Sequence, residues 1–469
     1  MDIGDKIQYR QKARGLVLEN FKSFITEEKE EKYRILVVSE KPDNNDLFHT
    51  AQRFVDECKK VDIPCYVLFA SEAKIVDGKA FNVDDKEGFE ISRDDTIAII
   101  RGSVASRDAW LDIVSQLEKL GICCINSRST ISMCADKYWT SLRLADASIP
   151  TPKTTLVQSE DTLQESLDII GEEYPMILKT LRGSKGIGVI FIESKRQLSS
   201  LLQLLWKQDE TTEILLQSYI KSDFDVRVLV LNGKVQTAMR RDVIEGDFRS
   251  NYSRGAKVKK YKLNDEEVAV CLKADKSVNG IWTAVDFIKD GNKTFVLEVN
   301  SSPGTEGIEK ATGKNLIKEL IEHFKDRSNW RYTALEIGHR EVVSIKPFGE
   351  LEAKFDTGNS ASASTIHADK IDVNGKKVTW SYAGKTLTNK IERIVKVDVG
   401  GLNNYTEERY AILLDIEFAG SLYKNVEILL DNREGRSPIL FNRDFMKRSN
   451  VMVNPSRKYI VTTKYTLDK

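Results

Sequence analysis

Several signals that would place this chain in a familiar class of protein are absent from its sequence. The six cysteines include no CxxC pair, so they lack the spacing of a zinc ribbon or a dithiol redox motif. The four histidines lie far apart, which argues against a histidine-rich zinc cage. Scattered cysteines in a long chain are usually buried small hydrophobes in a reducing compartment, and we expect the same here.

Long apolar runs and an excess of charge of one sign are also missing. Lys+Arg and Asp+Glu both number 71, so the charge balance indicates neither a nucleic-acid partner nor a membrane surface. No apolar run approaches the roughly 18 residues of a membrane-spanning helix. The beginning, MDIGDKIQYRQKAR, lacks the apolar core of a signal peptide. We therefore expect a cytoplasmic protein with no nucleic-acid or membrane partner.

The length and the first third of the sequence predict a multi-domain protein that contains a parallel sheet. A chain of 469 residues is too long for one ordinary core and suggests about three domains. Residues 1–32 form a charged arm, interpreted as a solvated helix or a contact to another subunit. Strand-like and helix-like stretches then alternate in YRILVVSE, FHTAQRFVDECKKV, PCYVLFA and TIAIIRGS, which predicts an open Rossmann-type sheet over residues 33–130. No GxGxxG follows these strands, so dinucleotide binding is not predicted.

The rest of the chain predicts two further domains of different character. Residues 131–326 change to a helix, β-hairpins and mixed strands, and residues 327–340 are interpreted as a linker. Residues 341–469 are rich in strands such as KVTWSY, IVKVDVG and YAILLDIEFA, and their spacing predicts an all-β, barrel-like module. The predicted fold class is thus α/β plus β.

A candidate metal site lies in two strands near residue 300. In TFVLEVN, Glu298 and Asn300 are two residues apart and project from the same face of a strand, and Asp286 lies near the end of the strand TAVDFI. Two carboxylates and an amide oxygen on neighbouring strands suit Mg²⁺. The alternative is a solvated sheet edge with ordinary strand carboxylates.

A glycine-rich hairpin is the second candidate. YPMILKT and VIFIES predict two strands, and RGSKGIG between them is the tip. Gly183, Gly186 and Gly188 would let backbone N–H groups approach phosphates, and Lys179 on the entering strand could supply a positive charge. No helix follows and GK[ST] is missing, so this is not a Walker A loop. The alternative is an ordinary turn.

The segment LLQSYIKSDFDVRVLVLNGKV is the third candidate. Gln217, Ser218, Tyr219 and Ile220 end an apolar strand, where backbone groups could hydrogen-bond an adenine. Asp225, in the following strand, could reach a ribose.

The fourth candidate, RRDVIEGDFRSNYSRGA, concentrates arginines among small polar residues. Guanidinium forks suit phosphate and carboxylate oxygens. The alternative is a solvated basic loop. The residues concerned are Arg240, Arg241, Arg249, Ser250, Asn251 and Arg254.

These motifs, taken in order, resemble a known family. The run from about residue 97 to 326 resembles the ATP-grasp superfamily and, within it, the RimK family of glutamate ligases. The matching stretches are RGSVASRDAW, DKYWTSLRLADASIPTP, LRGSKGIGV, SYIKSDFDVRVLV, EGDFRSNYSRGA and EVNSSPGTEGIEKATG. The resemblance implies a Rossmann-like pre-ATP-grasp domain over residues 33–130 and an ATP-grasp domain over residues 131–326.

The resemblance also implies roles for individual residues. Asp286, Glu298 and Asn300 would hold Mg²⁺, with Mn²⁺ as an alternative, and Arg241, Arg249 and Arg254 would act in catalysis. One departure is Ser218, where the family usually has an acidic residue; because the hinge works through backbone groups, ATP binding is still expected. The implied nucleotide-binding residues are Lys137, Lys179, Gly183, Ser184, Gly186, Gly188, Gln217, Ser218, Tyr219, Ile220, Asp225, Arg249, Ser250 and Asn251.

The implied reaction is ATP-dependent ligation. A substrate carboxylate takes the γ-phosphoryl group to form an acyl phosphate, and an amine then attacks through an oxyanion that the arginines and Mg²⁺ could stabilise. Glutamate is the favoured amino acid, and the acceptor would be a peptide or protein C-terminus or a small acid. The rivals are a small-molecule glutamate ligase and an ATP-sensing binding protein whose β-module docks a partner.

The last module carries a shorter signal. Asp356, Thr357 and Gly358 follow a predicted strand, and Asn442 and Arg443 follow the apolar run SPILF. KFDTGNSASASTIHA, ILLDNREGRSPILFNRDF and VMVNPSRKY resemble the retropepsin-like family of RimB peptidases, also described as ATP-dependent zinc proteases.

Two consequences follow from this second resemblance. With one DTG per chain, catalysis would need a homodimer that pairs two copies of Asp356, and a fused ligase and peptidase would then add and trim amino acids. Zinc is disfavoured because only His367 lies near Asp356 in the sequence. Asn442 replaces a family glycine, which puts the close packing of that loop in question. The alternative is a non-catalytic binding or dimerising module.

Overall fold

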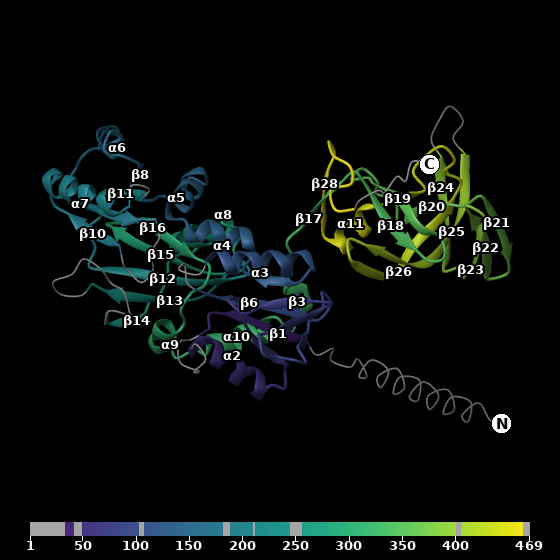
Figure 1. Cartoon of the computed structure of the whole chain (residues 1–469), viewed down its shortest axis with the longest axis horizontal. Helices are drawn as coiled ribbons and strands as arrows, with labels where there is room; N and C mark the ends of the chain where they lie inside the picture. Colours follow the sequence, from purple (N-terminus) through teal and green to yellow (C-terminus); the bar gives the residue numbers. More distant parts are fainter. Residues whose placement is uncertain are drawn as a thin grey trace, which may run out of the picture. The chain divides into compact units, whose positions relative to one another are not determined.

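The computed structural model describes residues 33–41, 49–102, 107–181, 188–209, 212–243, 256–399 and 405–462 (Figure 1). The chain divides into two compact units, Met1–Arg331 and Tyr332–Lys469. Among the described residues, no helix combines the length and the apolar character needed to cross a membrane.

A four-stranded parallel sheet opens the first unit. Its strand order is β2-β1-β6-β7, and all three neighbouring pairs are parallel, as the alternation of strands and helices predicted. One face packs on α3, where Leu36, Val38, Ala98 and Ile100 share a core with Trp110. The elements are β1 (Arg34–Ser39), α2 (His49–Lys60), β2 (Cys65–Phe69), β6 (Thr96–Arg101), α3 (Arg107–Lys119), β7 (Cys123–Ile125) and the short antiparallel strands β3 (Lys74–Val76), β4 (Lys79–Phe81) and β5 (Phe89–Glu90).

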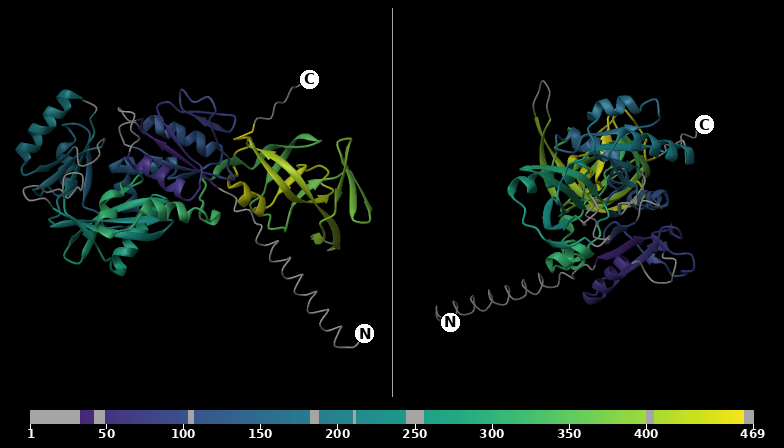
Figure 2. Two further views of the ribbon diagram at one scale, coloured as in Figure 1. Left: turned by 90° about the horizontal axis from the view of Figure 1, so that it is seen from below. Right: turned by 90° about the vertical axis from the view of Figure 1, so that its left-hand side faces the viewer.

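A small antiparallel sheet of order β10-β9-β11-β8 follows. β9 and β10 form the predicted hairpin, with Lys179 opposite Val189. The purple parallel sheet and the teal antiparallel strands lie in different parts of the first unit (Figure 2). The elements are α4 (Arg128–Ala135), α5 (Lys137–Asp146), β8 (Thr154–Val157), α6 (Leu163–Ile170), β9 (Met176–Thr180), β10 (Val189–Ile192), α7 (Lys195–Gln208) and β11 (Ile214–Ser218).

A five-stranded antiparallel sheet of order β14-β13-β12-β15-β16 completes the first unit. Along β12, Val226 and Val228 share a core with Cys271 of α8, so the alternate residues Asp225 and Arg227 point to the opposite face. The elements are β12 (Phe224–Leu231), β13 (Lys234–Asp242), β14 (Val258–Lys260), α8 (Asp265–Ser277), β15 (Trp282–Asp290), β16 (Lys293–Asn300), α9 (Glu306–Thr312), α10 (Leu316–His323) and the 3-10 turn η3 (Arg327–Asn329).

The second unit contains a six-stranded barrel, in agreement with the predicted barrel-like module. The sheet runs β18-β19-β27-β20-β26-β25-β24; the first six strands form the barrel, which closes where Ser344 of β18 pairs with Glu417 of β25, and β24 extends the sheet beyond β25. The elements are β17 (Leu335–Gly338), β18 (Arg340–Ile345), β19 (Gly349–Phe355), β20 (Ser364–His367), β21 (Lys370–Asn374), β22 (Lys377–Tyr382), β23 (Lys385–Lys390), β24 (Arg393–Val399), β25 (Tyr405–Phe418), β26 (Ser421–Asp431), β27 (Ile439–Phe441), α11 (Arg443–Ser449) and β28 (Val451–Asn454).

The buried carboxylate of Glu341 ties the last described segment to this barrel. It accepts hydrogen bonds from the backbone N–H groups of Gly338 (2.7 Å), Ile460 (2.8 Å) and Thr462 (3.1 Å). A buried acid with several backbone donors is stabilised without a cationic partner.

Candidate functional site

Three charged residues lie side by side across the five-stranded sheet. The strand register sets Arg227 of β12 opposite Asp286 of β15, and Asp286 opposite Glu298 of β16. The oxygens of Asp286 accept from Nε of Arg227 at 2.8 Å and from its Nη2 at 2.6 Å. The same Nη2 lies 3.9 Å from a carboxylate oxygen of Glu298. The two predicted metal-ligating carboxylates are therefore neighbours.

A β-bulge sets the direction of Glu298. The register between β15 and β16 shifts after Asp286, so Leu297 is an extra residue without an opposite partner. Val296 and Val299 both face the core shared with α8, and Glu298 faces the side of Asp286. Bulges re-aim side chains in this way.

A second arginine, on strand β13, also binds Asp286. Arg241 of β13 donates from Nε and Nη2 to the oxygens of Asp225 at 2.6 and 2.7 Å, and from Nη2 to Asp286 at 2.9 Å. Asp225 and Arg241 are both buried. Asp225, predicted to reach a ribose, and Arg241, predicted to act in catalysis, are thus joined to each other; their contacts with substrates stay predictions.

The electrostatic environment shifts the pKa values of Asp286 and Glu298 in opposite directions. Burial alone raises the pKa of Asp286, but Arg227 and Arg241 outweigh it and hold that pKa well below its usual range. The surrounding protein partly desolvates the Glu298 carboxylate and so raises its pKa, and the charge of Asp286 raises it further. The Glu298 side chain is 44% exposed, so it remains accessible to a ligand. A cation beside Glu298 would relieve this repulsion.

The donor set fits a hard cation. Asn300 lies two residues after Glu298 at the end of β16, and its amide oxygen accepts from the backbone N–H of Ser302 at 3.0 Å, which restrains the side chain. Among the described residues, no three His, Cys, Asp or Glu side chains gather as a metal site. Asp286, Glu298 and Asn300 would therefore supply only part of an oxygen shell. Mg²⁺ usually takes a few protein oxygens and completes its shell with water and phosphate.

Two lysines lie within electrostatic reach of Glu298. Nζ of Lys179 donates to the side-chain oxygen of Gln217 at 2.7 Å, and Nζ of Lys137 donates to the carbonyl of Leu181 at 3.2 Å. Burial lowers the pKa of Lys137, and it lowers the pKa of Lys179 to about 8, with Glu298 opposing both shifts. Gln217, predicted for the adenine hinge, thus holds Lys179 through its side chain.

The rest of the predicted nucleotide site lies along β11 and the hairpin. Ser218 donates its backbone N–H to the carbonyl of Lys153 at 2.9 Å, and the ring of Tyr219 packs edge-on against Phe191 at 5.0 Å. Gly188 has a φ of 77°, and a Cβ there would lie 2.2 Å from the hydroxyl of Thr180, so only glycine fits. Ile220 follows Tyr219 and is partly buried. Outside the described residues lie Gly183, Ser184, Gly186, Arg249, Ser250, Asn251 and Arg254.

In the second unit, Asp356 lies directly after β19. Its carboxylate, 34% exposed, accepts from the backbone N–H of Gly358 at 3.0 Å and from Nζ of Lys354 at 3.2 Å. Nε of Arg443 donates to the carbonyl of Thr357 at 2.8 Å, which joins the two segments that sequence analysis paired.

Asn442, which sequence analysis singled out as a departure from the resembled pattern, makes several hydrogen bonds. Its side-chain oxygen caps α11 by accepting from the N–H of Phe445 at 3.0 Å, and its amide donates to the carbonyl of Ala361 at 2.9 Å. The hydroxyl of Ser364 donates to the same oxygen at 3.0 Å. The buried Asn442 side chain thus caps α11 and joins it to the segment around Ala361.

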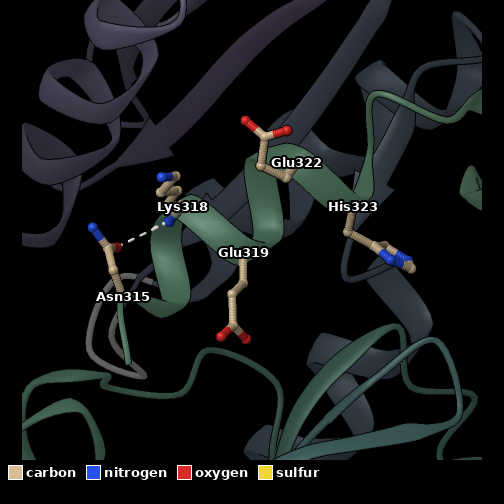
Figure 3. A pocket seen from close by; sticks show the side chains of 5 residues that line it. All are labelled: Asn315, Lys318, Glu319, Glu322 and His323. Atoms are coloured by element: carbon tan, nitrogen blue, oxygen red, sulfur yellow. Dashed lines mark hydrogen bonds between the residues drawn. The ribbon is translucent and has the colours of Figure 1, made fainter. Parts of the chain in front are cut away.

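A surface depression of about 610 Å³ in the first unit is lined by none of the candidate site residues (Figure 3). It is lined by the helix α10 and its cap, where Asn315 accepts from the N–H of Lys318 at 3.0 Å. The side chains drawn in Figure 3 point in different directions along the helix and do not converge. This depression carries no constellation for catalysis.

Comparison with known proteins gives a consistent set of relatives. The model of the RimK-like ATP-grasp domain matches residues 134–324. A protein of Legionella pneumophila (strain Corby) named "Probable alpha-L-glutamate ligase" is 34% identical over 218 residues, which is 46% of this chain and 71% of that protein. A protein of the same name from Shewanella loihica is 36% identical over 215 residues, 45% of this chain and 70% of that protein.

Solved structures of ligases are also similar. The ATP-grasp ligase PsnB in complex with a minimal precursor has a TM-score of 0.48 at 20% identity, over 62% of this chain and 97% of PsnB. The D-alanine–D-alanine ligase of Bacillus anthracis has a TM-score of 0.47 at 17% identity, over 63% of this chain and 98% of that ligase.

Proposed function

Because this chain belongs to the RimK-like ATP-grasp family, we propose that its first unit is an ATP-dependent carboxylate–amine ligase, which forms an amide and releases ADP and phosphate. The observation that carries the proposal is the convergence of Asp286 and Glu298 with Lys137 and Lys179. Carboxylates for a cation and lysines for phosphates are the groups that phosphoryl transfer needs.

In this proposal each residue has a defined task. Asp286, Glu298 and Asn300 hold Mg²⁺, which when bound neutralises charge on the transferring phosphoryl group. Lys137 and Lys179 bind phosphate oxygens. Arg227 and Arg241 keep Asp286 ionised and fixed in direction, so they act as positioning residues.

The reaction proceeds in two balanced steps. An oxygen of the acceptor carboxylate attacks the γ-phosphorus and ADP leaves, which gives an acyl phosphate. The amine nitrogen of the amino acid then attacks the acyl carbon, loses a proton, and expels inorganic phosphate together with the former carboxylate oxygen. We propose Arg249 and Arg254 as the groups that stabilise the oxyanion.

We propose glutamate as the amino acid and a peptide or protein C-terminus, or a small acid, as the acceptor. Support comes from the two relatives, which are named alpha-L-glutamate ligases. The test is ADP release with Mg-ATP across the twenty amino acids, followed by intact mass analysis of each mixture. Glutamate-dependent ADP release with mass increments of added glutamate is expected. ATP binding without turnover, with every amino acid and a mixed peptide pool present, would favour the ATP-sensing rival.

The affinity for ATP is expected to depend on pH through Lys179. Its pKa lies at about 8 in the free protein, and a bound phosphate would raise that value. The ammonium is therefore present below pH 8 and is lost as pH rises, so ATP affinity should fall by up to about tenfold per pH unit above 8. Titration calorimetry between pH 7 and 9.5 measures this. Lys179→Met should flatten the profile, and the exposed Lys207→Met should leave it unchanged; an equal slope in all three proteins would contradict the assignment.

A second candidate function concerns the barrel. We propose that Asp356 is the catalytic carboxylate of a peptidase formed by two copies of this chain, so the protein would be a homo-oligomer in the cytoplasm. The peptidase proposal is supported by the exposure of the Asp356 carboxylate beside the Thr357–Arg443 contact. The proposed location in the cytoplasm is supported by six cysteines that form no disulfide bond.

Asp356→Asn should abolish the shortening of glutamate-extended products while leaving ligation unchanged, because two paired carboxylates must share one proton. The exposed Asp372→Asn serves as control. Mass spectrometry of the products over time reads both activities. Trimming that persists in Asp356→Asn would leave the barrel as a binding or dimerising module.

A further inference from the structure

Two buried polar side chains end adjacent strands of the parallel sheet. Ser39 is the last residue of β1, Arg101 is the last residue of β6, and the register sets them opposite each other. Register partners project from the same face of a sheet. The carboxyl edge of a parallel sheet is the place where open α/β folds bind ligands.

Both side chains have donors without an acceptor. Arg101 is 6% exposed, and its Nη2 donates to the carbonyl of Pro303 at 2.9 Å. Within the described ranges, its Nε and Nη1 have no hydrogen-bond partner, and neither has the hydroxyl of Ser39, which is 1% exposed. The guanidinium lies over the ring of Trp282, 5.4 Å from the centroid, which fixes its plane.

Among the described residues, no charge compensates this guanidinium. Burial lowers the pKa of Arg101 to about 10, and no acidic side chain of the described chain opposes that shift. Arg241, another buried arginine of the unit, is bound by two carboxylates. A buried, unpaired charge is costly, and proteins normally pair it. An anion that binds here would supply the missing partner.

The position of Arg101 connects it to the proposed ligase site. Pro303 follows Asn300 by three residues, and Ser302 between them donates its N–H to Asn300. Trp282 precedes Asp286 by four residues on β15. The Arg101 donors that lack an acceptor therefore lie next to the turn that follows the proposed metal ligand Asn300. Lys137 and Lys179, the proposed phosphate ligands, come from other elements, α5 and β9.

We propose that Arg101, with Ser39, binds the α-carboxylate of the amino-acid substrate. The inference rests on the proposed ligase function and deepens it by naming the group that selects the substrate class. The α-carboxylate of the attacking amino acid is not consumed, so it stays charged through the reaction and needs a fixed partner. Guanidinium donors match planar carboxylates better than a lysine does.

Arg101→Met separates this role from a structural one. The variant should raise the KM for glutamate roughly 10- to 100-fold, the range expected for a lost hydrogen-bonded charge pair, with little change in the KM for ATP. Without ligand, it should melt at the same or a higher temperature than the wild type, because an unpaired buried charge is removed. Ser39→Ala should show a smaller rise in the same KM, and the exposed Arg196→Met should show none.

An analogue identifies the bound group. Isoglutamine, in which the α-carboxylate of glutamate is an amide, should bind the wild type as weakly as glutamate binds Arg101→Met, and the variant should not distinguish the two ligands. Glutamate alone should raise the melting temperature of the wild type and not that of the variant. These binding readouts do not need turnover, so they stand apart from a failure of the ligase reaction itself.

Three results would overturn the proposal. A raised KM for ATP with an unchanged KM for glutamate would assign the site to a phosphate. A fall of several degrees in the melting temperature of ligand-free Arg101→Met, together with unchanged KM values, would make Arg101 structural. If Arg101→Met fails to fold, Arg101→Lys and Ser39→Ala are compared with the wild type instead. If both of these variants still prefer glutamate over isoglutamine as strongly as the wild type does, the assignment is contradicted.

Discussion

Glu298→Gln is expected to lower kcat for amino-acid-dependent ADP release by on the order of 10²- to 10³-fold, the range seen when one electrostatic contact to a transition state is removed. The substitution keeps the shape of the side chain and deletes its charge. Glu298 is the carboxylate of the cluster that stays 44% exposed, so it is the one a metal–phosphate complex can reach directly. Steady-state ADP release at saturating ATP and glutamate measures the effect.

The control is Asp290→Asn, on the same strand as Asp286 but exposed to solvent. It should leave kcat unchanged. The fold of Glu298→Gln should be intact, because the pKa of Glu298 is already raised by burial and by Asp286, and loss of its charge relieves repulsion. A variant that keeps wild-type kcat would remove Glu298 from the proposed site.

Arg241→Met is expected to destabilise the first unit by about 3–5 kcal/mol, the cost of leaving a buried carboxylate without its partner. Arg241 is bound by Asp225 and Asp286, and all three residues are buried. Calorimetry of the full chain should show a clear fall in the melting temperature of one transition. The double variant Asp225→Leu with Arg241→Met should recover most of that loss, because the buried carboxylate that Arg241 bound is then removed as well.

The control lies one residue further along β13. Asp242 pairs with Arg240 and Lys259 at a site that is about one third exposed, so Asp242→Asn should change stability by only ~0–1 kcal/mol. Acid should act in the same direction as Arg241→Met. The pKa of Asp286 is depressed in the folded state, so the stability it contributes is present above its unfolded pKa and is lost as pH falls below about 4. Equal effects of Arg241→Met and Asp242→Asn would contradict this account.

Much of the fold could be predicted because short apolar runs and their spacing are local properties. The runs around Val37, Leu68 and Ile99 became the parallel strands, and the hairpin of β9 and β10 formed where the glycine-rich tip predicted it. The barrel of the second unit also follows from closely spaced strands. Its closure between β18 and β25 could not be predicted, because it depends on pairing between distant segments.

The site was predictable only in part for the same reason. The spacing of Glu298 and Asn300 and the neighbouring position of Asp286 follow from local strand geometry. Sequence analysis missed Arg227, although the Asp225-x-Arg227 spacing places both side chains on one face of β12 and could have indicated it. The bulge at Leu297 and the pairing of Ser39 with Arg101 depend on the register between strands. A local sequence pattern does not determine that register, so neither feature could be predicted.

The most direct test of the central claim follows an oxygen atom. Glutamate labelled with ¹⁸O in its carboxylates serves as both amino acid and acceptor, with Mg-ATP, and the inorganic phosphate is analysed by mass spectrometry. An acyl phosphate predicts one ¹⁸O atom transferred to phosphate for every amide bond formed, and in Glu298→Gln the transfer should slow in proportion to the lowered kcat. Amide formation with unlabelled phosphate would contradict the account, because the carboxylate would then have been activated in another way.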